Sequence, residues 1–176
     1  MVEDPNPGSD RFRLTSLEAL GNGTALVTQI YALVDSSHFF TEFTRDDIKL
    51  LAAYMDVYRA QSGQTIIRES EVGDFMLLVI EGEVDIYKKN LVGVQQHITT
   101  VGPGMTLGEM SMIDGEPRFA TCLAVSETTF GVLTRDNMVK IILERPSVGA
   151  KVLVKLVTLL SQRLRQTSAK LLQYLS

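Results

Sequence analysis

The sequence predicts a mainly β fold with flanking helices, in which short strands build a compact β-barrel or roll. Residues 56–133 hold short apolar segments separated by glycine-containing turns, which is the pattern of an all-β core. Within it, Val84 and Ile86 alternate with Asp85 and Tyr87, so the strand is expected to be buried on one side. Helical patterns precede and follow this region. With 176 residues, 45% of them hydrophobic, the chain is long enough for one core and a helical extension.

The N-terminal region predicts a tail and two helices. Residues 1–13 are polar and rich in proline and glycine, so a flexible tail is expected there rather than a signal peptide. Residues 15–35 predict an amphipathic helix interrupted near residues 21–23. Residues 44–54 predict a second helix, because Thr44 can cap it and two aspartates follow in the first turn.

The C-terminal region predicts two more helices. The first spans residues 135–144, the Arg145-Pro146 pair interrupts it, and Ser147 is expected to cap a long helix to the C-terminus. Along this helix a seam of mostly apolar residues, with Thr167 as its polar member, recurs at alternating steps of three and four: Ala150, Leu153, Val157, Leu160, Leu164, Thr167, Leu171 and Tyr174. That seam favours a homodimer through a parallel two-helix coiled coil over residues 150–174.

A second apolar surface on the same helix leaves an alternative open. It consists of Val152, Val154, Leu156 and Leu159. This surface is expected to cover the barrel while the seam meets a partner. The alternative is a single amphipathic helix that packs only on its own barrel.

The densest motif is the segment Leu107–Thr121. The backbone N–H groups that follow Gly108 open a short helical turn, which attracts an anion. Arg118 offers a planar fork of donors for two phosphate oxygens. Glu109, when ionised, is only an acceptor and can hold a sugar hydroxyl. The segment therefore predicts a site for a nucleotide with a phosphate and a free ribose hydroxyl, the alternative being a surface loop with an ordinary Glu–Arg ion pair.

This motif resembles the phosphate-binding cassette of the cyclic nucleotide-binding domain family, found in bacterial catabolite activator proteins and eukaryotic protein kinase A regulatory subunits. Upstream, residues 63–67 and 73–86 resemble the glycine-bounded strands of that family. The resemblance covers residues 39–175 and departs at Ser70, where a glycine is usual, and at Phe119. It implies a jelly-roll-like β-roll with N-terminal helices and a long C-terminal dimerisation helix.

The resemblance also implies a domain division and a ligand. It implies a tail at 1–13, a cyclic nucleotide-binding domain at 14–146 and a lid and dimerisation helix at 147–176. The implied ligand is a 3′,5′-cyclic mononucleotide, with cAMP preferred and cGMP possible. The preference follows from Phe119, which offers no hydrogen bond where cGMP-binding members often carry a threonine; its bulk could also crowd the pocket.

Residue roles carry over by position in the motif. Arg118 is expected to pair with the phosphate, helped by the backbone of Gly108, Met110 and Phe119, and Glu109 to hold the ribose 2′-OH. The rest of the implied pocket is Ile86, Ile98, Thr99, Leu107, Ser111, Ala120 and Cys122. In the family's long helix a Thr-Ser pair meets the ligand. Here it implies Thr167 at the adenine amino group and Ser168 across the dimer, the alternative being Thr167 bonded to a helix carbonyl and Ser168 in water.

Other classes of function find little support. His38 and His97 are far apart in sequence, and neither lies beside a nucleophile or a metal-ligand cluster, so no catalytic or metal site is expected. The single cysteine, Cys122, excludes an internal disulfide and suits the cytoplasm, and no apolar run of membrane-spanning length occurs. The net charge of −4 disfavours nucleic acid.

We therefore expect a cAMP-preferring receptor, not an enzyme, that changes conformation on binding and signals through an unidentified protein partner. It is expected not to bind DNA directly, because no helix-turn-helix follows residue 176. No membrane partner is expected either, because no apolar run is long enough to span a membrane. Two alternatives stay open. One is an interaction module that kept the fold without binding nucleotide, and the other is the sensor fragment of a cAMP-dependent transcription regulator.

Overall fold

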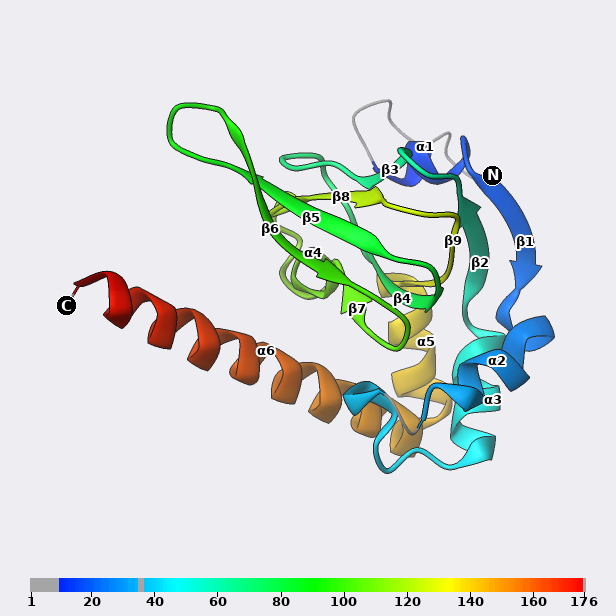
Figure 1. Ribbon diagram of the computed structural model, residues 1–176. Helices are drawn as coiled ribbons and strands as arrows, with labels where there is room; N and C mark the ends of the chain where they lie inside the picture. Colours follow the sequence, from blue (N-terminus) through cyan, green and yellow to red (C-terminus); the bar gives the residue numbers. More distant parts are fainter. Residues whose placement is uncertain (1–9, 35–36, 176) are drawn as a thin grey trace.

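Two antiparallel sheets form the body of the computed structural model, which describes residues 10–34 and 37–175 (Figure 1). One sheet has the strand order β1-β2-β9-β4-β7 and the other β3-β8-β5-β6. The strands are β1 (Glu18–Asn22), β2 (Asp56–Ala60), β3 (Thr65–Ile67), β4 (Phe75–Glu81), β5 (Val84–Lys89), β6 (Gln95–Val101), β7 (Thr106–Leu107), β8 (Thr121–Ala124) and β9 (Thr128–Thr134). The predicted mainly β roll with flanking helices is confirmed, as two sheets rather than a closed barrel.

Helices lie before β1, between β1 and β2, between β7 and β8, and after β9. They are α1 (Asp10–Leu14), η1 (Gly23–Leu26), α2 (Val27–Ala32), η2 (His38–Phe40), α3 (Arg45–Ala53), α4 (Glu109–Asp114), α5 (Arg135–Glu144) and α6 (Pro146–Leu175). Among them, none is long and apolar enough to cross a membrane in the part of the chain that the structure describes.

Strand β4 connects two hydrophobic cores. Its side chains alternate between them: Phe75, Leu77 and Val79 enter the core of the roll, whereas Met76 and its alternating neighbours enter the core under the helices. Because successive strand residues point to opposite faces, a strand covered on both sides reads as a continuous apolar run. The run of apolar residues from Phe75 to Ile80 is therefore buried throughout.

The N-terminal region differs from its prediction in two places. Residues 18–22, expected inside a helix, form β1, which pairs with β2 through Ala19 and Tyr58. Pairing along an open sheet edge outweighs a weak local helical pattern. The predicted flexible tail includes Arg13, but Asp10–Leu14 is helical. Residues 1–9 and 35–36 of these predictions lie outside the described residues.

Helices α3 and α5 occur as predicted. Thr44 caps α3: its hydroxyl accepts from the Asp47 backbone N–H at 3.2 Å, and the Asp47 carboxylate accepts from the Thr44 N–H at 2.9 Å. This reciprocal capping box satisfies two N–H groups that the helix itself leaves unpaired. Helix α5 spans the predicted range.

Helix α6 begins one residue earlier than predicted, at Pro146, so Ser147 lies inside the helix and does not cap it. Proline suits the first helical position because its fixed φ is already helical and no N–H is needed there. In Figure 1 the helix runs beneath the roll and extends past it, on the side to which the β5–β6 hairpin also extends.

Two different faces of α6 are apolar. Val148, Val152 and Leu156 are buried in the core under the helices, and Leu159 packs against that core. Val154, predicted on the same surface, is instead 61% exposed, because it lies on another side of the helix. The predicted seam is open to solvent at Leu153, Val157, Leu164 and Leu171, with exposures from 39% to 68%. The side chain of Tyr174, its last member, lies outside the described residues.

Ser70 takes a backbone conformation that favours glycine. Its φ is +69°, in the left-handed region, where a Cβ atom crowds the backbone. The Ser70 N–H donates to the carbonyl of Arg118 at 2.9 Å, so this turn supports the loop that carries the arginine.

We expect Ser70→Gly to raise the free energy of unfolding by about 0.5–1 kcal/mol, because glycine removes that strain. Urea denaturation measures the change. Ser126→Gly is the matched control, since Ser126 is not among the described residues with positive φ, and it should lose stability. A loss in Ser70→Gly equal to that of the control contradicts the strain argument.

Candidate functional site

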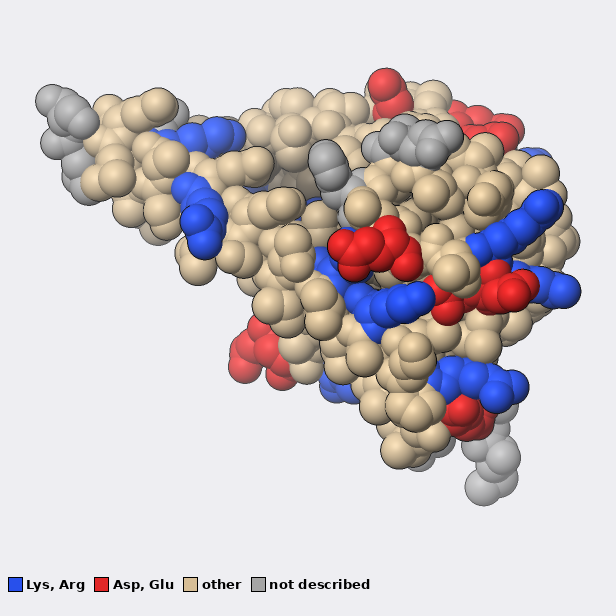
Figure 2. Space-filling view, turned by 90° about the horizontal axis from the view of Figure 1, so that it is seen from below, with Lys and Arg blue, Asp and Glu red and all other residues tan. Residues whose placement is uncertain are grey.

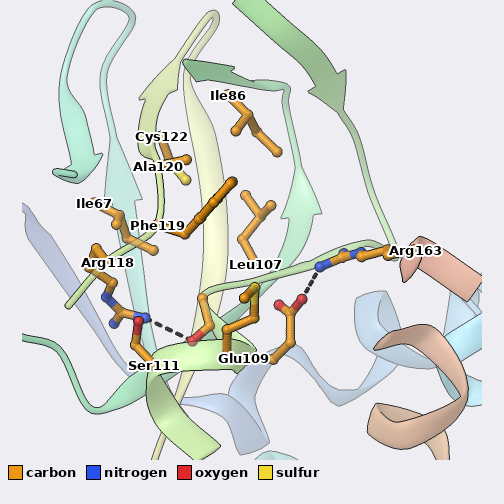
Figure 3. Close-up of a pocket in the computed structure, with 12 residues that line it drawn as sticks. Ile67, Ile86, Leu107, Glu109, Ser111, Arg118, Phe119, Ala120, Cys122 and Arg163 are labelled. Atoms are coloured by element: carbon orange, nitrogen blue, oxygen red, sulfur yellow. Dashed lines mark hydrogen bonds and ion pairs between the residues drawn. The ribbon is translucent and has the colours of Figure 1, made fainter. Parts of the chain in front are cut away.

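The residues of the predicted motif line a pocket between the roll, α4 and α6 (Figure 3). The cavity volume is about 110 Å³, and the pocket opens to solvent. Its lining consists of Ile67, Ile86, Leu107, Gly108, Glu109, Met110, Ser111, Arg118, Phe119, Ala120, Cys122 and Arg163.

Gly108 fixes the turn from β7 into α4. Its φ is +79°, and an added Cβ would lie 2.6 Å from Arg118 Nη1 and 3.0 Å from the Phe75 carbonyl oxygen. Both the backbone conformation and the available space therefore require glycine. At the other end of α4, Arg135 donates to the carbonyls of Ser111 and Met112 at 2.7 and 2.6 Å, which holds the short helix in place.

Arg118 is buried, with 3% of its surface exposed, and its guanidinium is held on two sides. Its Nε donates to Asp10 Oδ2 at 2.5 Å and its Nη1 donates to the Gly108 carbonyl at 2.7 Å. The Phe75 ring lies 4.5 Å from the guanidinium carbon, a cation–π contact. The Arg118 N–H donates to the Glu71 carbonyl at 2.8 Å, so its backbone is fixed as well.

Glu109 is buried on the opposite side of the pocket and pairs with Arg163 of α6 (Figure 3). Arg163 also donates from Nη2 to the Thr106 carbonyl at 2.8 Å. Burial lowers the pKa of the Arg163 guanidinium below its ordinary value. The pair ties the long helix to the first residue of α4.

Two buried polar atoms of these residues have no hydrogen-bond partner among the residues that the structure describes. They are Arg118 Nη2, a donor, and Glu109 Oε2, an acceptor. Leaving such atoms buried and unpaired is costly, and they are rare in folded proteins unless they serve a ligand or a water. One pocket thus carries a free cationic donor and a free anionic acceptor.

Most of the predicted site residues meet in this pocket. Every predicted residue from Leu107 to Ser111 and from Arg118 to Ala120 lines it, with Ile86 and the buried free thiol of Cys122. Burial raises the pKa of Cys122 to about 12, so the thiol stays protonated at neutral pH.

Four predicted residues do not line the pocket. Thr99 pairs with Ile86 across the β5–β6 ladder, and Ile98 beside it is 54% exposed. Thr167 and Ser168 are exposed on α6, at least one helical turn beyond Arg163. Their ligand roles stay predictions.

Phe119 places its side chain in the pocket, among Ile67, Leu107 and Ile86 (Figure 3). The side chain is 59% exposed and belongs to neither core. The Lys88 ammonium lies 4.4 Å from its ring centroid and donates to its carbonyl at 2.7 Å, so that carbonyl already has a partner.

Sequence reasoning missed two partners of the site. They are Arg163, which the sequence analysis does not include in the site, and Asp10, which lies in the expected tail. Neither carries a local signal, because Arg163 is 54 residues from Glu109 and Asp10 is 108 residues from Arg118. An arginine four residues before Thr167 on the same face was the one available hint.

Comparison with known proteins identifies the architecture. The sequence model described as the cyclic nucleotide-binding domain matches residues 58–145, half of the chain. The chain belongs to the cyclic nucleotide-binding domain family. A crystal structure of a cyclic nucleotide-binding domain from Methylobacillus flagellatus is 35% identical and covers 90% of this chain and 89% of its own, with a TM-score of 0.81.

By their names, one curated relative is a receptor protein and another is a transcriptional regulator. The cyclic AMP receptor protein of Thermus thermophilus is 28% identical over 77% of this chain and 61% of its own. The cAMP-activated global transcriptional regulator of Mycobacterium tuberculosis is 30% identical over 62% of this chain and 47% of its own. This cyclic nucleotide-binding domain protein therefore spans about half to three fifths of the length of these relatives, and the family it matches is a regulatory one.

Proposed function

We propose that the protein is a receptor for a 3′,5′-cyclic mononucleotide and prefers cAMP. The observation that carries the proposal is the pair of unpartnered buried atoms, Arg118 Nη2 and Glu109 Oε2, in one pocket. A cyclic nucleotide supplies a phosphate oxygen for the first and the ribose 2′-OH for the second. Such charge-assisted hydrogen bonds are about twice as strong as neutral ones.

The apolar part of the lining suits a purine base and a sugar. Ile67, Ile86 and Leu107 offer aliphatic surface, and Phe119 offers an aromatic face on which a base can stack. Phe119 has no hydrogen-bonding group for the guanine 2-amino group, which supports the preference for cAMP. Leaving that amino group unpaired on burial costs about 1–3 kcal/mol.

Helix α6 is proposed to transmit the binding event. Arg163 joins α6 to Glu109, the residue proposed to hold the ribose, so a ligand on Glu109 alters the contact that positions the helix. The exposed seam of α6 supports a homodimer, in which a shift of the helix reaches a second subunit and, through it, a protein partner. The proposed function is binding and signalling, with no catalytic step. The buried free thiol of Cys122 suits the reducing cytoplasm.

The ribose contact can be tested with Glu109→Gln. The variant should bind cAMP more weakly and should discriminate less between cAMP and its 2′-deoxy analogue, because the buried charged acceptor is replaced by a weaker, neutral one. Competition binding with both nucleotides measures the ratio. Glu116→Gln is the control, since Glu116 is exposed and outside the pocket lining. Equal losses for the two nucleotides in Glu109→Gln contradict the ribose assignment.

A further inference from the structure

We propose that Asp10, in helix α1, is a positioning residue that holds the Arg118 guanidinium in its phosphate-binding orientation, and that α1 therefore belongs to the ligand site. The inference rests on the proposed function. Its basis is a fully buried ion pair between two segments 108 residues apart.

Two of the three guanidinium nitrogens of Arg118 donate hydrogen bonds within the protein. Asp10 Oδ2 accepts from Nε, and the Gly108 carbonyl accepts from Nη1. A planar group held at two of its nitrogens has its third nitrogen fixed in direction. That nitrogen, Nη2, is the atom without a partner in the described part of the chain. Asp10 thus helps to set where a phosphate oxygen meets the arginine.

Helix α1 is anchored on the same turn as Arg118. The Asp10 N–H donates to the Val72 carbonyl at 3.1 Å, and the Arg118 N–H donates to the neighbouring Glu71 carbonyl at 2.8 Å. Arg13 adds an ion pair to the Glu71 carboxylate. The backbones of Asp10 and Arg118 are thus hydrogen-bonded to adjacent residues of one turn, which fixes the geometry of their ion pair.

The space for this pair depends on Gly73. An added Cβ there would lie 2.2 Å from both Arg118 Nε and Asp10 Oδ2. The φ of Gly73 is not in the left-handed region, so glycine is required for space and not for backbone conformation. The glycine at position 73 therefore supports the Asp10–Arg118 ion pair independently of the distance between the two side chains.

A carboxylate near a phosphate also repels it, and this effect opposes the positioning role. Arg118 neutralises Asp10 before the ligand arrives, and burial raises the pKa of the Asp10 carboxyl, which the charge of Arg118 opposes. Asn and Ala at this position separate the two effects. The Asn amide oxygen still accepts from Nε but carries no charge, whereas Ala removes the acceptor.

Calorimetric titration of the full chain with cAMP tests the proposal. Asp10→Ala should weaken binding about tenfold or more, and Asp10→Asn should stay within about threefold of wild type, as expected for a residue that orients a ligand-binding group. Gly73→Ala should weaken binding as Asp10→Ala does. Tighter binding in both Asp10 variants, or an unchanged affinity in Asp10→Ala, overturns the proposal.

Arg13→Ala is the matched control, because Arg13 anchors the same helix through Glu71 without touching Arg118. It should stay within about twofold of wild type. A loss as large as that of Asp10→Ala would mean that docking of α1, and not orientation of Arg118, is the cause, and would overturn the proposal.

The Arg118 Nε–H resonance in ¹⁵N NMR of the free protein gives a readout that needs no nucleotide. It should be protected from exchange in wild type and lose that protection in Asp10→Ala, while backbone resonances far from α1 stay unchanged. If wild type bound neither cAMP nor cGMP, the proposed function would fail, and this resonance alone would decide the orienting role. Unchanged protection in Asp10→Ala overturns it.

Discussion

Arg118→Ala should raise the dissociation constant for cAMP by about thirtyfold or more. Losing a charge-assisted contact in a desolvated site costs about 2–5 kcal/mol, and Arg118 is the buried cation with a free nitrogen in the pocket lining that the structure describes. Arg118→Lys should recover only part of the affinity, because an ammonium cannot reproduce the planar fork. Isothermal titration calorimetry measures the dissociation constant for cAMP of the wild type and of both variants.

The same substitution should also lower stability, since it leaves the Asp10 carboxylate buried without its partner. Binding is therefore compared at a temperature at which circular dichroism shows each variant folded. Arg59→Ala serves as control, because Arg59 pairs with Glu18 near the surface and outside the pocket lining. Affinity within about twofold of wild type in Arg118→Ala would remove the phosphate assignment.

Val157→Asp combined with Leu164→Asp should convert a dimer into a monomer. Both side chains are at least 65% exposed in a single subunit, so the substitution spares the subunit's own core. In a two-helix seam the four carboxylates would face each other without solvent, which strongly opposes association. Light scattering coupled to size-exclusion chromatography measures the mass.

Val154→Asp is the matched control for the seam. Val154 lies on the same helix and is 61% exposed, but it is not a seam position. The control should remain a dimer. Figure 2 shows basic side chains on this face of the projecting end of α6. A monomeric wild type at all concentrations, with and without cAMP, would contradict the dimer.

The cassette was predictable from the sequence because its geometry is local. Gly108, Glu109 and Arg118 are separated by one turn, one short helix and one loop, so their spacing alone brings them to one pocket. The strands that follow β1, and helix α5, were predictable for the same reason: their side-chain periods are set by the backbone. Ser70 keeps the backbone conformation of the family's turn although its residue type differs. Its φ is left-handed, which favours the glycine that the family usually has there.

The contacts that complete the site were not predictable. The partners of the cassette, Arg163 and Asp10, come from the two ends of the described chain, and only the folded roll brings them to Glu109 and Arg118. The prediction of a helix over the residues of β1 was wrong for a related reason. These residues gain their conformation from pairing with β2, which no local pattern encodes. The parts of the site and of the fold that the sequence pattern did not predict are those that depend on contacts between residues far apart in the sequence.

Calorimetric titration of the wild-type protein with cAMP and cGMP tests the central claim most directly. We expect one site per subunit, with a dissociation constant for cAMP below about 100 μM and weaker binding of cGMP. An affinity for cGMP equal to or tighter than that for cAMP would overturn the base preference. No detectable binding of either nucleotide up to about 1 mM would contradict the receptor function itself and favour an interaction module that keeps the fold without its ligand.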